Sequence, residues 1–222
     1  MLNRIQVIGS GRVGSAVGAR LRERGLTVGG DDPELVLLCV PDTAIAEVAS
    51  KVERGPWVAH VSGATPLGAL APHVRRFSVH PLQTFTRSRG PEQLDGAWAA
   101  VTAETEAARA TGDWLAKTLG LRPFELDDSA RTLYHAGAVF ASNYLVTLQR
   151  AASLLLDAAG APPEALEPLM RRTIENGFEL TGPISRGDWA TVEAHRAAIR
   201  TKRPELDDLY ETLAGATMAL AT

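Results

Sequence analysis

Short apolar runs alternate with segments of helical periodicity over the first half of the chain. Apolar, β-branched runs that end at turn residues predict buried strands. Such runs cover residues 4–8, 26–28, 34–40, 57–61, 77–79, 98–101 and 123–126. Apolar residues three or four apart, closed by a stop signal such as glycine, predict helices over residues 12–24, 43–52 and 105–119. Strands that alternate with helices predict an α/β fold around a parallel sheet.

The pattern changes near residue 128. Residues 129–159, 163–179, 188–202 and 204–220 show helical periodicity without an intervening strand pattern. We therefore expect an α/β domain over residues 1–128 and an all-helical domain over residues 129–222.

The connection after the second expected strand is too short for the usual arrangement. Parallel neighbours normally need a crossover of a dozen or more residues, usually a helix. Here only Gly29-Gly-Asp-Asp-Pro33 separates residues 26–28 from residues 34–40. The sequence therefore predicts a Rossmann-type sheet with a shortened crossover after its second strand.

A glycine-rich turn joins the first strand to the first helix. It reads Gly9-Ser10-Gly11-Arg12-Val13-Gly14, which is the G-x-G-x-x-G spacing. Gly9 permits the tight turn, Gly11 lets backbone approach a pyrophosphate, and Gly14 lets helix and strand pack closely. Free N–H groups and the helix dipole favour phosphate at this position. We expect these six residues to bind a dinucleotide, with a nicotinamide dinucleotide as the cofactor.

The choice between NAD and NADP stays open in the sequence. Asp31 lies 20 residues after Gly11, where NAD-binding proteins often carry an acid for the ribose 2′-hydroxyl. Aspartates before a proline also occur in turns for local hydrogen bonds alone, and Arg12 could instead face a 2′-phosphate. Val40-Pro41-Asp42 follows a central strand and is expected to contact the cofactor, although a Pro-Asp turn also caps helices.

Further strings occur in order along the chain: His60-Val-Ser-Gly63, His80-Pro-Leu-Gln-Thr-Phe85, Ser142-Asn143, Leu180-Thr-Gly-Pro183 and Arg186-Gly-Asp188. With the glycine turn, they resemble the Rossmann-like NAD(P)-dependent oxidoreductases with a C-terminal helical domain of unknown function. These belong to the 6-phosphogluconate-dehydrogenase-like group, with pyrroline-carboxylate reductases and an alternative type of ketopantoate reductase. The resemblance implies an NAD(P)H-dependent reductase of a small keto or imino acid. It also implies that residues 1–128 are a Rossmann-type dinucleotide-binding domain and that residues 129–222 serve substrate binding and dimerisation. The protein would be a dimer, with hydride transfer in a cleft between the domains.

The chain departs from this group at its proton donor. Related β-hydroxyacid dehydrogenases carry lysine four residues before asparagine, and Val139 stands there. Histidine titrates near neutral pH and can take that role. At about 100° per residue, His135 and Ser142 lie roughly 20° apart on one helix, and Asn143 about 80° away. His135 is therefore a candidate acid, with Asn143 a ligand for a substrate oxygen; His80 could replace His135.

The remaining polar residues allow two interpretations each. His60 ends a core strand and is expected to be structural, while Ser62 beside it is a candidate cofactor contact. Arg186 could bind a substrate carboxylate bidentately, or pair with a nearby acid. Asp188 is a plausible helix N-cap.

Composition narrows the setting. The formal charge of −3 gives no reason to expect nucleic acid or an anionic membrane as partner. The single cysteine, Cys39, lies in an apolar run, which predicts a buried thiol in a reducing, cytoplasmic compartment. The five histidines lack metal-binding spacing, so no metal is expected. A non-catalytic cofactor-binding or sensing protein, or a helical dimerisation protein with a vestigial Rossmann half, are the alternatives to a reductase.

Overall fold

The computed structural model describes residues 2–220 and divides into two compact units, one ending at Phe140 and the other beginning at Ala141. Helix α4 (Arg131–Val139) belongs to the first unit. Its first residue, Arg131, is buried and bonded to the strand-bearing part of the chain. The domain boundary near residue 128 stays a prediction.

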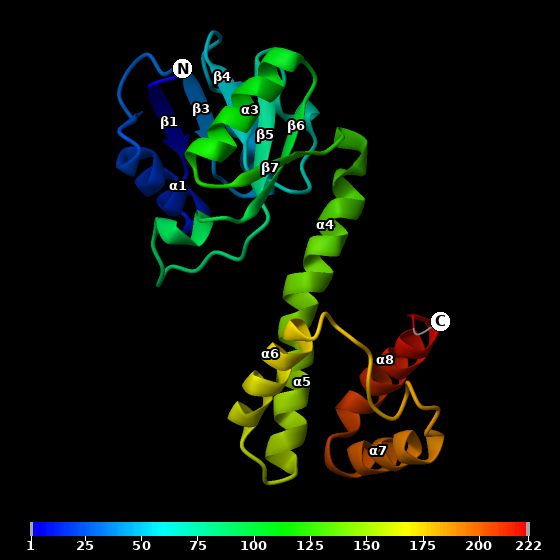
Figure 1. The fold of residues 1–222 in the computed structure, drawn as a ribbon. Helices are drawn as coiled ribbons and strands as arrows, with labels where there is room; N and C mark the ends of the chain where they lie inside the picture. Colours follow the sequence, from blue (N-terminus) through cyan, green and yellow to red (C-terminus); the bar gives the residue numbers. More distant parts are fainter. Residues whose placement is uncertain (1, 221–222) are drawn as a thin grey trace. The chain divides into compact units, whose positions relative to one another are not determined.

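One seven-stranded sheet organises the first unit, in the order β2-β1-β3-β4-β5-β6-β7 (Figure 1). The strands are β1 (Arg4–Ile8), β2 (Thr27–Val28), β3 (Leu35–Leu38), β4 (Trp57–His60), β5 (Arg76–Pro81), β6 (Trp98–Ala103) and β7 (Arg122–Glu125). β1 to β5 are parallel, whereas β6 runs antiparallel to β5. The Rossmann-type fold is confirmed, and the sheet is mixed at one edge. Residues 82–97 hold only the short η3 (Pro91–Leu94), so no crossover helix returns the chain parallel.

Helices cover both faces of the sheet. α1 (Arg12–Glu23) and α3 (Glu106–Thr118) pack on one face through Val17, Leu21 and Leu115; Figure 1 shows α3 crossing the strands. α2 (Ile45–Ser50), which follows η1 (Asp42–Ala44), packs with η2 (Leu67–Leu70) on the other face. The carboxyl ends of β1, β3 and β4 carry the candidate site residues between these layers.

The shortened crossover has a simple cause in the register. β2 pairs with β1 only at Arg4 and Ile5, and β3 begins opposite Ile5 on the other side. The end of β2 and the start of β3 are therefore level, about 10 Å apart across β1. Residues 29–34 can span this distance, because an extended chain covers about 3.3 Å per residue. The early end of β2 makes a crossover helix unnecessary.

The second unit is helical, as expected. It contains α5 (Leu145–Ala158), α6 (Leu166–Glu175), α7 (Trp189–Lys202) and α8 (Asp207–Leu220), with the short η6 (Pro163–Ala165) and η7 (Pro204–Leu206). The backbone N–H of Thr191 donates to Asp188 Oδ1 at 3.1 Å, which confirms Asp188 as the N-cap of α7. None of the helices in residues 2–220 combines the length and apolar character needed to cross a bilayer.

Candidate functional site

The glycine turn after β1 is built from close backbone contacts. Gly9 adopts a φ of +114°, and a Cβ there would collide with the Cys39 carbonyl. A Cβ on Gly14 would collide with the Gly9 carbonyl. Both positions therefore require glycine, and the reasons match those predicted from the spacing.

The N-terminus of α1 is exposed at Gly11. Gly11 is the N-cap of α1, and as a glycine it has no side chain that could bond to the first-turn amides. A Cβ there would meet no other atom within 4 Å. Ser10, Gly11 and Arg12 are exposed. The first-turn amides of α1 are thus accessible to an anion, which is the arrangement that binds a pyrophosphate. A dinucleotide fits this turn.

Two hollows flank the turn. The loop-side hollow, about 290 Å³, lies between α1 and residues 86–91 and is lined by Arg12, Arg87 and Arg89. The β2-side hollow, about 500 Å³, is lined by Val7, Gly14, Gly18, Arg22, Val28 and Gly29, among others. Both include Ser10, so the turn lies between them.

Asp31 lies away from this turn. The Arg4 guanidinium, at the start of β1, donates to the Asp32 backbone carbonyl at 2.8 Å and to its carboxylate at 3.2 Å. Asp31 lines a separate hollow together with Arg4 and Glu34. Asp31 lines neither of the two hollows beside the glycine turn. Its contact with a cofactor ribose stays a prediction.

Ser62 and Asp42 are joined at the ends of β3 and β4. The Ser62 hydroxyl lies 2.7 Å from Asp42 Oδ2 and 2.9 Å from Thr65 Oγ1, and it accepts from the Thr65 N–H at 3.0 Å. Ser62 is buried, whereas Asp42 and Pro41 are exposed and Val40 is half-buried. The bonds of Ser62 fix the loop after β4. In the Ser62–Asp42 pair, Asp42 is the residue exposed to solvent.

His80 and His135 meet in the first unit. His80 lies within β5, which extends beyond the expected strand of residues 77–79, and its Nδ1 is 2.7 Å from the Tyr134 hydroxyl. The ring centroids of His80 and His135 are 6.3 Å apart. A Cβ on Gly63 would come within 2.9 Å of both rings. Gly63 therefore leaves the space into which the two imidazoles fit.

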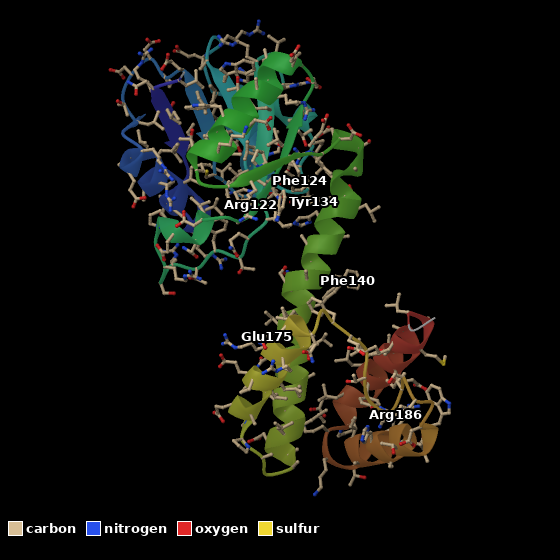
Figure 2. The ribbon with its side chains drawn as sticks, in the orientation of Figure 1. Arg122, Phe124, Tyr134, Phe140, Glu175 and Arg186 are labelled. Carbon is tan, nitrogen blue, oxygen red and sulfur yellow. The ribbon has the colours of Figure 1, made fainter. Side chains whose placement is uncertain are left out.

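The environment keeps His80 neutral. Burial, with help from His135 and Arg131, lowers the pKa of His80 to about 4. Burial raises the pKa of Tyr134 to about 12, so its phenol keeps the proton and can donate it to His80 Nδ1. With Nδ1 accepting, Nε2 of the neutral ring carries hydrogen and can donate. Figure 2 shows Tyr134 near Phe124, and their ring centroids are 6.0 Å apart.

Arg131, which the sequence did not predict as a site residue, links three segments of the chain. Its buried guanidinium donates to Asp128 Oδ1 at 2.8 Å, to the Ser62 carbonyl at 3.0 Å and to the Ser78 hydroxyl. Asp128 Oδ1 also accepts from the Leu67 N–H at 3.0 Å. Polar residues every third position, Asp128, Arg131 and Tyr134, were the available signal, because that spacing places them on one helix face.

His60 is wholly buried, as its place in a core strand suggested. The Ser62 N–H donates to His60 Nδ1 at 3.2 Å, so Nε2 carries the ring hydrogen. Among the residues described, Nε2 has no hydrogen-bond partner. Burial, together with Arg131, lowers the pKa of His60 to about 3, which keeps this ring neutral.

Three predicted site residues belong to the second unit. Ser142 donates to Asn143 Oδ1 at 3.0 Å, and Asn143 is exposed. Residues Phe140–Tyr144 are π-helical, so the 100° spacing used to place Ser142 and Asn143 beside His135 does not hold there. Arg186 is exposed on the segment before α7, where Figure 2 labels it. The roles of these three residues stay predictions.

Within residues 2–220, no group of three or more histidine, cysteine, aspartate or glutamate side chains could hold a metal ion.

The fold and the glycine turn define a Rossmann-type protein. The chain belongs to the family described as a domain of unknown function (DUF2520), whose model matches residues 97–217. No curated protein matches the sequence.

Solved structures share the fold at low identity. A candidate NADP oxidoreductase from Bacteroides fragilis is 22% identical, with a TM-score of 0.82 and 98% of each chain covered. A protein from Thermotoga maritima is 22% identical, with a TM-score of 0.76, covering 98% of this chain and 97% of that one. A 1-pyrroline-5-carboxylate reductase from Streptococcus pyogenes is 15% identical, with a TM-score of 0.62, covering 98% and 97%. The resemblance inferred from the sequence is confirmed for family and fold.

Proposed function

We propose that this protein is an NAD(P)H-dependent reductase of a small keto or imino acid. The open mouth of α1 at Gly11 carries the proposal, because exposed backbone amides and a turn without side-chain obstruction suit a pyrophosphate. Ser10, Arg12 and Val13 would share the grip on the phosphates. The similar fold of proteins named as an NADP oxidoreductase and as a pyrroline-carboxylate reductase supports the same chemistry.

The strand ends supply the groups that such a reduction needs. Bound NADPH or NADH supplies the hydride. Val40, Pro41 and Asp42 would position the ribose and nicotinamide, next to the loop that Ser62 holds. His135, half-exposed beside His80, would give a proton to the substrate oxygen or nitrogen. His80, kept neutral, would donate a hydrogen bond from Nε2 without changing its charge.

Residues of the second unit complete the proposal. Asn143 and Ser142 would bind a substrate oxygen, and the guanidinium of Arg186 would bind the carboxylate of a keto or imino acid. These assignments follow the sequence strings and the exposure of Asn143 and Arg186.

Cofactor binding and turnover test the proposal separately. The full chain should quench its tryptophan fluorescence on addition of NADPH or NADH, and it should oxidise one of them in the presence of a keto acid or a cyclic imino acid. A ligand at 100 times its Kd adds about 2.7 kcal/mol to the free energy of unfolding, which a melting curve resolves. If neither cofactor changes the fluorescence or the Tm, the proposal is wrong.

The second candidate function is a non-catalytic cofactor sensor. The early end of β2 favours it, since a short second strand offers less surface for the adenosine half of a dinucleotide. Binding without turnover across the whole substrate panel would select this function over a reductase.

We also propose a homodimer formed through the helical unit. Exposed apolar side chains on α5, α6 and α8 favour it, because such surface usually pairs with a partner. They are Leu145, Val146, Leu148, Leu154, Leu169, Ile174, Leu213, Met218 and Leu220. Sedimentation equilibrium of the full chain should give twice the 23.6 kDa monomer mass; a monomer at micromolar concentration would contradict the proposal.

A further inference from the structure

The β2-side hollow lies where a dinucleotide places its adenosine ribose. In Rossmann folds this ribose follows the pyrophosphate toward the end of the second strand. The hollow contains Gly9 and Gly14 from the turn, together with Val28 and Gly29 at the end of β2. Because β2 stops opposite Ile5, Val7 of β1 also lines it. A molecule held at the turn would extend into this space.

The charge of the hollow comes from one side chain. Among its described lining residues, Arg22 is the only charged one, and none is acidic. The Arg22 guanidinium folds back along α1, with Nη1 3.6 Å from the place a Cβ on Gly18 would occupy. This carries the positive charge one turn of the helix closer to the glycine turn than the Arg22 backbone.

Arg22 has no ion pair among the described residues, unlike its neighbour. Arg20 pairs with Glu23 at 3.1 Å and with Asp95 at 2.5 Å. The nearest acids in sequence after β2, Asp31 and Asp32, do not line this hollow, and Arg4 binds Asp32. The β2-side hollow therefore has a guanidinium without an ion pair among the described residues, and no lining carboxylate that would accept a 2′-hydroxyl.

We infer that Arg22 binds the ribose 2′-phosphate and makes the protein select NADP(H) over NAD(H). A guanidinium has only donors, and its planar fork matches a phosphate. A neutral 2′-hydroxyl would form a weaker interaction with the guanidinium than a charged 2′-phosphate does. Since β2 is short, little protein surface remains for the adenine, and the phosphate contact supplies a larger share of the affinity. This inference rests on the proposed function.

Calorimetric titration of the full chain with NADPH, NADH, 2′,5′-ADP and 5′-AMP, at one fixed salt concentration, tests it. NADPH should bind at least about tenfold more tightly than NADH, the size expected of hydrogen bonds to a charged group. Arg22→Ala should raise the Kd of NADPH and of 2′,5′-ADP by about the same factor. The Kd of NADH should change less than about twofold.

Two matched variants separate this role from general charge. Arg24, the exposed C-cap of α1, does not line the hollow, so Arg24→Ala should leave every Kd unchanged. Arg12→Ala, at the turn itself, should weaken NADPH and NADH equally. All three arginines are exposed, so the variants should fold; their melting curves without ligand check this.

The failures are distinguishable. If the wild-type protein binds NADPH and NADH equally, or Arg22→Ala binds NADPH unchanged, the inference is overturned while the proposed function stands. If no dinucleotide binds at all, the proposed function falls together with it.

Discussion

Gly11→Ala should weaken cofactor binding about 100-fold without harming the fold. Gly11 has a φ of −70°, which alanine adopts without strain, and its Cβ would meet nothing within 4 Å. Alanine is a poorer N-cap than glycine, by about 1 kcal/mol at most. It also restricts the unfolded chain, which stabilises by about 0.4–1 kcal/mol. These effects nearly cancel, so the Tm without ligand should stay within about 2 °C of the wild type.

The same methyl group occupies the space through which a pyrophosphate approaches the amides. A 100-fold rise in Kd, about 2.7 kcal/mol, is the expected cost of that obstruction. At a cofactor concentration 100 times the wild-type Kd, ligand adds about 2.7 kcal/mol to the wild type but only about 0.4 kcal/mol to the variant. At roughly 2–4 °C per kcal/mol, the Tm should rise by about 5–10 °C and about 1 °C, respectively.

Differential scanning fluorimetry with and without NADPH measures both quantities. Gly68→Ala is the matched control, because a Cβ there also meets nothing within 4 Å and Gly68 lines neither hollow beside the turn. Gly14→Ala is the opposite case: its Cβ would overlap the Gly9 carbonyl and should lower the Tm without ligand. A full ligand-induced rise in Tm for Gly11→Ala would refute binding at this backbone.

Three further predictions concern His135, His80 and Arg131. His135→Ala should lower turnover by about 10²–10³-fold and leave the Kd of NADPH within about twofold; steady-state kinetics with an unchanged rate would exclude His135 as the acid. Because burial holds the pKa of His80 near 4, the unfolded state binds more protons between about pH 6.5 and 4. Stability is therefore full above about pH 6.5 and falls as the pH drops toward 4, by roughly 3 kcal/mol from this ring. Urea unfolding should show that fall in the wild type and a smaller one in His80→Gln; equal slopes would contradict the assignment. Arg131→Met should lower the free energy of unfolding by about 2 kcal/mol, since the Ser62 carbonyl and the Ser78 hydroxyl lose a buried donor; a loss below about 1 kcal/mol in the same assay would show that the cation is dispensable.

The sequence was most informative where backbone geometry restricts residue choice. Gly9 and Gly14 could be assigned from spacing alone, because no other residue fits the contacts that a strand-turn-helix makes. The shortened crossover could be predicted from length, but its cause, the early end of β2 opposite Ile5, needed the register.

The site was harder to predict because its contacts join distant segments. Tyr134 bonds to His80, which lies 54 residues earlier, and no local pattern announces such a pair. Asp31 shows that spacing alone does not locate a side chain: its distance from Gly11 along the chain matches an expected value, yet it lines a hollow separate from those beside the turn. The regular 100° spacing likewise failed at Phe140–Tyr144, because helical periodicity does not reveal a π turn.

The reactivity of the single thiol, Cys39, should report on the glycine turn. Cys39 lies behind the turn, its Cβ 3.0 Å from where a methyl on Gly14 would stand, and burial raises its pKa to about 12. We therefore expect an alkylating reagent to reach the sulfur when helix α1 moves away from the strands. The labelling rate would then measure how often α1 moves away. A dinucleotide bound at the glycine turn should slow the reaction, and the test needs no substitution in the protein.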